Sequence, residues 1–225
     1  MKNTIKFLGF IALVAIIGFS MTACGDSDND SDCAHSFSKV ITPGYETDTC
    51  SKCGETGQKT LTLEVGDTGP AGGIIYYVSV AGFTVTFDNS IAHYLEAAPA
   101  DVVSAYIVWG GSTTNITGTV GSLGRGRENT ARIADADEWA IAANLCIEYG
   151  KDTDFNDWFL PSTGELSEMH KLKGTLGLPA TGGYWTSVQH SVDQALYVSF
   201  TGTNSSGIFI SKMDTGAKVR PVRAF

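Results

Sequence analysis

Three cysteines and one histidine lie close together near the N-terminus. One residue separates Cys33 from His35, two residues separate Cys50 from Cys53, and fourteen residues lie between the two pairs. Thiolate and imidazole are ligands that Zn²⁺ prefers, and two closely spaced pairs joined by an insert of hairpin length can surround one ion tetrahedrally. The spacing therefore predicts a structural zinc site in a small module, residues 33–63.

Another cysteine, Cys24, directly follows an apolar segment. Lys2 and Lys6 precede the 13-residue run Phe7–Phe19, and the sequence SMTAC follows this run. A positive start, a short apolar run and a small residue before the cleavage point are the layout of a secretory signal. The run is shorter than the about 20 residues that a membrane-spanning helix needs. SMTAC resembles the lipobox of bacterial lipoproteins, in which the cysteine is acylated and the chain is cut before it.

These features predict a signal peptide at residues 1–23 and lipid attachment at Cys24. The protein would then be held on the bacterial outer membrane or cell surface, with the periplasmic leaflet also possible. An ordinary signal followed by a chance cysteine is the alternative. Residues 24–32 contain four aspartates among small polar residues, which predicts a solvated tether between the anchor and the module.

The predicted export opens two other states for the module. Cysteines of exported proteins are often oxidised, so Cys33 could form a disulfide with Cys50 or Cys53. A module without any metal is the third possibility. Three cysteines and one histidine do not pair evenly, which favours the zinc site. About thirty residues bury too little apolar surface to fold without such a crosslink.

The charge of the chain bears on its partners. Removing Lys2 and Lys6 with the signal reduces the 15 basic residues to 13, against 24 acidic residues, so the mature chain has a net charge of −11. Binding to nucleic-acid phosphates needs a cationic face. The composition therefore argues against a nucleic-acid partner.

Residues 64–225 have the pattern of an α+β domain. Apolar residues at steps of three and four predict a helix over Asn129–Tyr149. Ser162 and Glu165 form a capping box, which predicts a second helix over Thr163–Lys173. Segments rich in β-branched and aromatic residues predict strands. These are a hairpin of Ile74–Val80 with Phe83–Phe87, and then Tyr94–Pro99, Tyr184–Ser187, Ala195–Phe200, Gly207–Lys212 and Lys218–Phe225.

A long loop separates the first strands from the helices. The segment Gly110–Glu128 contains six glycines and few large side chains. Loops of this length in a compact domain are usually functional or mobile. In the helix that follows, Trp139 and Cys146 flank the apolar stripe, so Cys146 is interpreted as a small buried hydrophobic residue and not as a nucleophile.

Five motifs follow one another along residues 65–225. They are GPAGGIIYY at Gly69–Tyr77, YLEAAPAD at Tyr94–Asp101, DWFLPSTGEL at Asp157–Leu166, YWTS at Tyr184–Ser187 and VRPVRAF at Val219–Phe225. In this order they resemble the Lcl C-terminal domain family of bacterial surface proteins, over nearly the whole of that range. The resemblance implies a C-type-lectin-like fold, more distantly related to formylglycine-generating enzymes. It implies a mixed, twisted antiparallel sheet with its first and last strands adjacent, two helices, and an irregular ligand-bearing loop region.

Sequence motifs for catalysis are missing. The chain has no G-x-S-x-G, H-E-x-x-H or Walker sequence. An oxidase of the formylglycine-generating type would need paired cysteines in the main domain, which has only Cys146. Calcium-dependent sugar binding of the lectin kind would need EPN or QPD together with WND, and these triplets are absent. We therefore expect no enzymatic activity.

An acidic segment follows the first predicted helix. Asp152, Asp154, Asn156 and Asp157 are spaced like the start of a calcium loop, but the glycine and glutamate that complete such a loop are missing. A solvated acidic turn is the preferred interpretation. We expect Asp157 to cap or pair within the fold and the adjacent Trp158-Phe159 to enter the core.

Ligand contact is predicted at the glycine-rich loop and its neighbours. Arginine forks suit sulfate or carboxylate groups, and aromatic faces suit sugar rings. The alternative is that Trp109 lies in the core and that both arginines are solvated or paired with acids. The candidate ligand-binding residues are Tyr106, Trp109, Arg125, Arg127 and Tyr184.

Together these features predict a lipid-anchored binding or adhesion protein of the cell envelope. Its lectin-like domain would recognise a glycan or protein ligand without catalysis. A structural envelope protein that interacts with other proteins is one alternative. A divergent enzyme of the formylglycine-generating type, dependent on Cys146, is another.

Overall fold

The computed structural model describes residues 37–42, 44–50, 56–103, 105–178, 181–203, 205 and 207–225. The chain divides into two compact units, Met1–Thr62 and Leu63–Phe225. The predicted signal peptide, the lipidation site Cys24 and the tether lie outside the described residues, as do Cys33, His35 and Cys53. Among the helices that the structure does describe, none has the length and apolar composition needed to cross a bilayer.

The first unit contains a three-stranded antiparallel sheet. The strands are β1 (Phe37–Thr42), β2 (Tyr45–Cys50) and β3 (Thr56–Leu61), in the order β1-β2-β3. Gly44, with a φ of 87°, makes the tight turn between β1 and β2, a conformation that favours glycine. Cys50 is buried at the end of β2, at the register position opposite Phe37.

The second unit has an α+β fold, as predicted, and its first sheet joins the two ends of the unit. This sheet contains β4 (Ile74–Val85), β5 (Ser90–Ala97) and β9 (Val222–Ala224), in the order β4-β5-β9, and all pairs are antiparallel. The last strand therefore pairs with the second strand of the unit and not with the first. This differs from the adjacency of first and last strands that the family resemblance implied.

The predicted hairpin within residues 74–87 is wrong. β4 continues through Gly82, and its partner is β5. The pairing is interrupted between Val78 and Phe83, where Gly82 has a φ of 76°. The actual reversal follows at Asp88–Asn89: Asn89 has a φ of 59°, and Asp88 Oδ1 accepts a hydrogen bond from the Ser90 N–H. Glycine thus marks a bulge here, and the Asp-Asn turn makes the hairpin.

A second antiparallel sheet is formed by β6 (Gly183–Gln189), β7 (Gln194–Ser199) and β8 (Gly207–Ser211), in the order β6-β7-β8. These strands and β9 correspond to the four predicted C-terminal strands, although β9 begins four residues later than expected. The strands of the unit therefore form two separate sheets, where the resemblance implied one.

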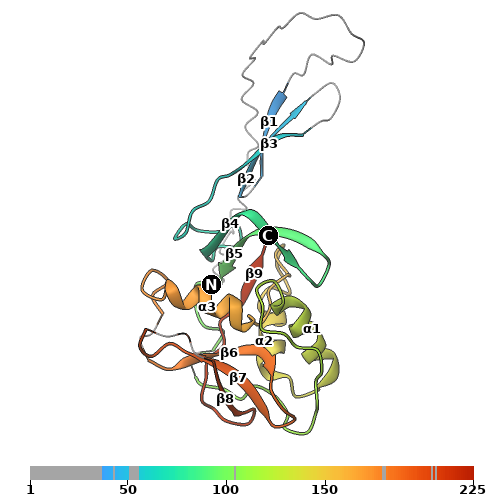
Figure 1. Ribbon diagram of the computed structural model, residues 1–225, viewed down its shortest axis with the longest axis vertical. Coiled ribbons are helices and arrows are strands. Elements are labelled where there is room, and N and C mark those ends of the chain that lie inside the picture. Colours follow the sequence, from blue (N-terminus) through green and yellow to red (C-terminus); the bar gives the residue numbers. More distant parts are fainter. Residues whose placement is uncertain are drawn as a thin grey trace, which may run out of the picture. The chain divides into compact units, whose positions relative to one another are not determined.

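Three helices connect the two sheets: α1 (Gly126–Ala136), α2 (Ile141–Tyr149) and α3 (Thr163–Lys171). Within the second unit, α3 lies between the sheets and packs against β4, β6 and β7, while α1 and α2 lie to one side (Figure 1). The core has two clusters, one around Phe159 and Leu166 and the other around Ile133 and Trp185. The prediction that Trp158 and Phe159 enter the core is confirmed, since both are buried.

The predicted single helix over residues 129–149 is wrong, because the structure breaks it into α1 and α2. At Asp137 the backbone is extended, with φ −130° and ψ 111°. The Asp137 carboxylate accepts a hydrogen bond from the Trp139 N–H at 2.9 Å, in competition with the helical pattern. Cys146 on α2 is fully buried, as predicted, and burial raises the pKa of its thiol well above the usual value.

The capping box predicted at the start of α3 is present. The Ser162 hydroxyl accepts from the Glu165 N–H at 3.3 Å, and Glu165 Oε2 accepts from the Ser162 N–H at 2.6 Å. Glu165 Oε1 also accepts from the N–H groups of Gly124 and Gly126, at 3.0 and 3.2 Å. This buried carboxylate therefore fastens the end of the glycine-rich loop to α3.

Candidate functional site

Of the predicted zinc ligands, the structure describes Cys50 alone. In the described part of the chain, no group of three or more His, Cys, Asp or Glu side chains could hold a metal ion. Because Cys33, His35 and Cys53 fall outside that part, the zinc site stays a prediction.

Two of the predicted ligand-binding residues belong to the core. Trp109 and Tyr184 are fully buried. The Trp109 indole N–H donates to the Thr186 carbonyl at 2.7 Å, and the Tyr184 ring packs edge-on against Phe200 at a centroid distance of 4.9 Å. Neither ring presents a face to solvent, so neither Trp109 nor Tyr184 can stack on a sugar ring.

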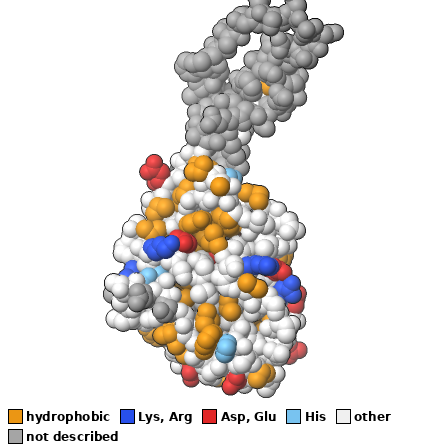
Figure 2. All heavy atoms as spheres, viewed as in Figure 1, with side chains coloured by type: hydrophobic (Ala, Val, Ile, Leu, Met, Phe, Trp, Pro, Cys, Tyr) orange, Lys and Arg blue, Asp and Glu red, His pale blue; other side chains and the backbone are white. Residues whose placement is uncertain are grey.

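Both predicted arginines are paired with acids. Arg125 bonds Glu128 at 2.8 Å, and Arg127 bonds Asp88 at 3.2 Å while its guanidinium lies over the Phe87 ring. On the face shown in Figure 2, basic side chains lie beside acidic ones and do not gather into a positive patch. These pairings match the alternative interpretation of the two arginines.

Tyr106 is 44% exposed, and its ring lies 5.8 Å from the Lys218 ammonium. It lies beside Gly182, whereas Arg127 contacts the turn between β4 and β5. The five predicted ligand-binding residues thus do not line one common pocket.

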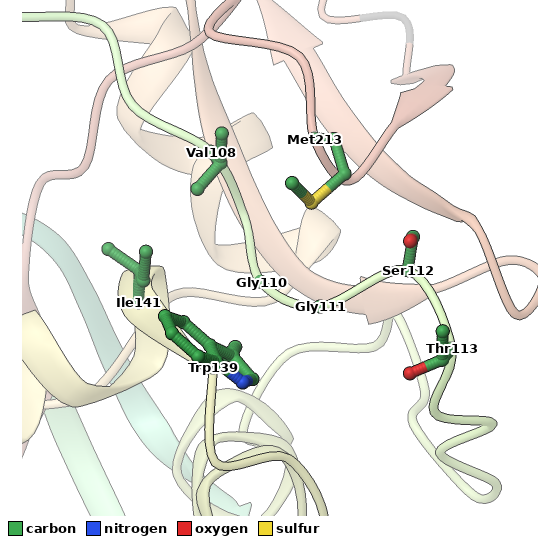
Figure 3. Close-up of a pocket in the computed structure, with 8 residues that line it drawn as sticks. All are labelled: Val108, Gly110, Gly111, Ser112, Thr113, Trp139, Ile141 and Met213. Atoms are coloured by element: carbon green, nitrogen blue, oxygen red, sulfur yellow. The ribbon is translucent and has the colours of Figure 1, made fainter.

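An apolar pocket is found instead where the glycine-rich loop begins. Its volume is about 340 Å³. Trp139 lies across this space from Ser112 and Thr113, and Met213 extends toward it from the segment after β8 (Figure 3). The Trp139 side chain is 70% exposed. The lining residues are Val108, Gly110, Gly111, Ser112, Thr113, Trp139, Ile141 and Met213.

The buried Asp137 carboxylate connects the two walls of this pocket. Its Oδ2 accepts from the Gly111 N–H at 2.8 Å, and its Oδ1 accepts from the Trp139 N–H at 2.9 Å. The Ala142 N–H also donates to the Trp109 carbonyl at 3.0 Å. The break between α1 and α2 therefore fixes the backbone on which Trp139 is displayed.

Glycine is needed on the loop side of the same contact. A Cβ at Gly110 would lie 3.1 Å from both Asp137 Oδ2 and the Trp139 carbonyl, and one at Gly111 would lie 2.9 Å from Asp137 Oδ1. Because any side chain there would displace the carboxylate, the two glycines allow the loop to approach Trp139 closely.

A buried lysine holds the loop from its other side. The ammonium of Lys212 donates to the Thr114 carbonyl, Gln189 Oε1 and the Val192 carbonyl at 2.8 to 2.9 Å. The backbone carbonyl of Lys212 accepts a hydrogen bond from the backbone N–H of Trp109 at 2.8 Å. Burial lowers the pKa of Lys212. The residue next to it, Met213, lines the pocket.

The lining of the pocket combines apolar surface with hydroxyl groups. Its eight lining residues include two hydroxyls, several apolar side chains and no ionisable group. The sequence pattern predicts the loop but not the role of Trp139, because a continuous helix would place this residue beside the apolar stripe. The aspartate two residues before the tryptophan was the available signal, since aspartate favours turns that end helices.

Comparison with known proteins assigns no family. No protein-family model matches the chain. No curated protein matches it either. Among solved structures, it is similar to a fimbrial protein from Bacteroides ovatus with 14% sequence identity and a TM-score of 0.48. The similarity covers 83% of this chain but 58% of the other, so this chain spans less than two thirds of that protein.

Proposed function

We propose that this protein is a lipid-anchored binding protein of the bacterial cell envelope, whose second unit binds a glycan without transforming it. The observation that carries the proposal is Trp139, which is 70% exposed beside the loop pocket. An exposed indole can stack on the apolar face of a sugar ring. Across the pocket, the hydroxyls of Ser112 and Thr113 can exchange hydrogen bonds with sugar hydroxyls.

The sequence supports the same proposal independently. The resemblance to the Lcl C-terminal domain family implies a lectin-like domain with a ligand-bearing loop region, and the pocket lies at the start of the glycine-rich loop. SMTAC at residues 20–24 supports lipid attachment at Cys24 and therefore a place on the envelope.

The charges favour a neutral glycan. The mature chain is acidic, and both Arg125 and Arg127 are paired with carboxylates. A sulfated or otherwise anionic glycan would have to displace these pairs against the overall negative charge. The loop pocket itself offers hydroxyls and apolar surface, which match uncharged sugar rings.

We also propose that the second unit does not catalyse a reaction. The pocket is lined by no ionisable side chain, and Cys146, on which an enzyme of the formylglycine-generating type would depend, is buried with a raised thiol pKa. A nucleophilic thiol must be accessible and ionised. Both observations favour a binding role.

The test uses the full mature chain on an array of neutral and anionic oligosaccharides, followed by titration of the glycans that bind. We expect neutral glycans to bind and Trp139→Ala to weaken their binding about 5- to 30-fold, because a central aromatic contact contributes about 1–2 kcal/mol. Phe209→Ala is the matched control, since Phe209 is 50% exposed but does not line the pocket. Unchanged affinity in Trp139→Ala, or no bound glycan at all, would contradict the proposal.

One observation favours a protein ligand as the second candidate. β8 lies at the edge of its sheet, and its side chains Ile208 and Phe209 are 42% and 50% exposed. An apolar edge strand can pair with a strand of another chain. A protein partner should co-purify with the wild-type protein but not with Phe209→Lys. This result would favour protein binding at β8 as the function.

A further inference from the structure

A second pocket in the Leu63–Phe225 unit has three aromatic walls. Its volume is about 360 Å³, and it shares no lining residue with the Trp139 pocket. The aromatic residues come from the end of α2 and from the segment that follows it. The full lining is Pro70, Ala71, Tyr149, Thr153, Phe155 and Trp158.

The rings form a corner and not a flat platform. Tyr149 and Trp158 have ring centroids 5.0 Å apart and an interplanar angle of 85°. Tyr149 remains 37% exposed, while Trp158 is anchored with 5% exposure. A sugar ring stacks best on one broad open face, whereas perpendicular rings enclose a compact, rounded group.

The turn that carries Phe155 is held in place by its own hydrogen bonds. The Thr153 N–H donates to the Gly150 carbonyl at 3.0 Å, and the Phe155 N–H donates to the Thr153 hydroxyl at 3.1 Å. Gly150 also lies directly against Trp158, where a Cβ would collide with the indole. The pocket is therefore formed before any ligand arrives, which reduces the cost of binding.

One of the three rings already makes a cation–π contact. The Arg223 guanidinium carbon lies 4.7 Å from the centre of the Phe155 ring. The Arg223 charge is offset by Asp157 at 2.8 Å and by Glu96 at 3.1 Å. The positive charge behind Phe155 is thus balanced inside the fold by two carboxylates.

Exposed negative charge flanks the pocket. Asp152 and Asp154 lie on either side of the lining residue Thr153, are exposed, and form no ion pair with any residue in the described part of the chain. The nearby Lys151 forms its ion pair with Glu148 at 2.9 Å, and its pKa is raised by Glu148 and, more weakly, by the charge of Asp152. The acidic segment identified in the sequence therefore places two exposed carboxylates beside the aromatic corner.

We propose that this pocket binds an organic cation of the alkylammonium class. Aromatic walls attract such a cation through their ring quadrupoles, and desolvation makes this attraction stronger than at an open surface. The two exposed carboxylates add long-range attraction for a positive ligand. A methylated ammonium group is compact and apolar at its surface, so it also fits walls that offer few hydrogen-bond donors.

The experiment titrates the full mature chain with choline while the indole N–H signals are followed by NMR. Choline should shift the Trp158 signal at millimolar concentration and leave the Trp139 signal unchanged. The neutral isostere 3,3-dimethyl-1-butanol is the ligand control, and it should bind at least about fivefold more weakly, since the cation–π attraction contributes about 1–2 kcal/mol.

Substitutions separate the contribution of the aromatic rings from that of the two carboxylates. Tyr149→Leu should weaken choline binding about 5- to 30-fold. The double substitution Asp152→Asn with Asp154→Asn alters exposed groups, so it tests the site even if Tyr149→Leu fails to fold. It should weaken binding about two- to fivefold and reduce its dependence on salt. Tyr106→Leu, at another exposed tyrosine, is the matched control and should change nothing.

Two results would overturn the proposal. Equal binding of choline and the neutral isostere would make the pocket merely apolar, and no Trp158 shift well above millimolar choline would remove the site. Sedimentation with phosphatidylcholine vesicles identifies the source of the ligand. Binding to vesicles as well as to free choline would assign a lipid headgroup, and binding to free choline alone would assign a small molecule.

Discussion

Glu165 is a carboxylate whose surroundings act in opposite directions. Burial raises its pKa to about 7, while hydrogen bonds from the N–H groups of Ser162, Gly124 and Gly126 favour the charged form and limit the rise. These bonds connect the glycine-rich loop to α3. The residue therefore links the pH of the solution to the stability of the second unit.

The sign of this linkage follows from the two pKa values. The unfolded chain has the ordinary value of 4.5, and the folded value is about 7. Between these values the folded state binds more protons, so the free energy of unfolding falls as pH rises from about 4.5 to 7, by up to about 3 kcal/mol. Below this range Glu165 is protonated in both states and its ionisation costs nothing.

We predict that Glu165→Gln has a flatter pH dependence of stability than the wild-type protein. The measurement is urea unfolding of both proteins at several values between pH 4.5 and 8, because the difference between them cancels the other titrating groups. At pH 4.5 the folded wild-type protein holds Glu165 protonated, and the glutamine side chain is likewise neutral with a carbonyl oxygen that can accept the Ser162 N–H, so the two proteins should differ there by less than about 1 kcal/mol. Parallel curves for the two proteins would show that Glu165 does not titrate in this range.

Helices and strands could be predicted from the sequence where residues close together in the chain determine them. The start of α3 was predicted correctly because its capping residues, Ser162 and Glu165, lie within four residues of each other. The break between α1 and α2 was missed because Asp137 is also held by Gly111, 26 residues away. The burial of Trp109 could not be predicted for the same reason. The hydrogen bond that anchors its indole in the core is accepted by Thr186, 77 residues further along the chain.

The pocket wall formed by the glycine-rich loop depends on a similar long-range contact. Lys212 holds the Thr114 carbonyl, which is 98 residues away, together with Gln189 and Val192. We predict that Lys212→Met lowers the free energy of unfolding by about 2–4 kcal/mol, because it leaves buried oxygens without their donor. Amide hydrogen exchange should also speed up around Thr114.

Lys151→Met is the matched control for this prediction. Lys151 is exposed and forms a surface ion pair with Glu148, so its loss should leave the free energy of unfolding nearly unchanged. Hydrogen exchange in the loop should not change with this control. If the Lys212 variant behaved like the control, the loop would be held by its other contacts, such as the bonds to Asp137.

At the scale of the whole molecule, the two units differ in what can stabilise them. The described residues of the unit Leu63–Phe225 form two sheets, three helices and a buried core. The described part of the first unit is a three-stranded sheet of short strands. So small a unit rarely folds on its own hydrophobic core, and it typically depends on a metal ion or a disulfide.

We predict that a strong zinc chelator unfolds the first unit and leaves the second unit intact. The predicted ligands Cys33, His35, Cys50 and Cys53 all precede the boundary at Thr62, whereas the tryptophans all follow it. Chelation of the mature chain should therefore release about one zinc ion and abolish amide protection in β1–β3, with no change in tryptophan fluorescence. Unfolding by a reductant, with no zinc released by the chelator, would instead identify a disulfide, because a thiol reductant opens a disulfide by exchange.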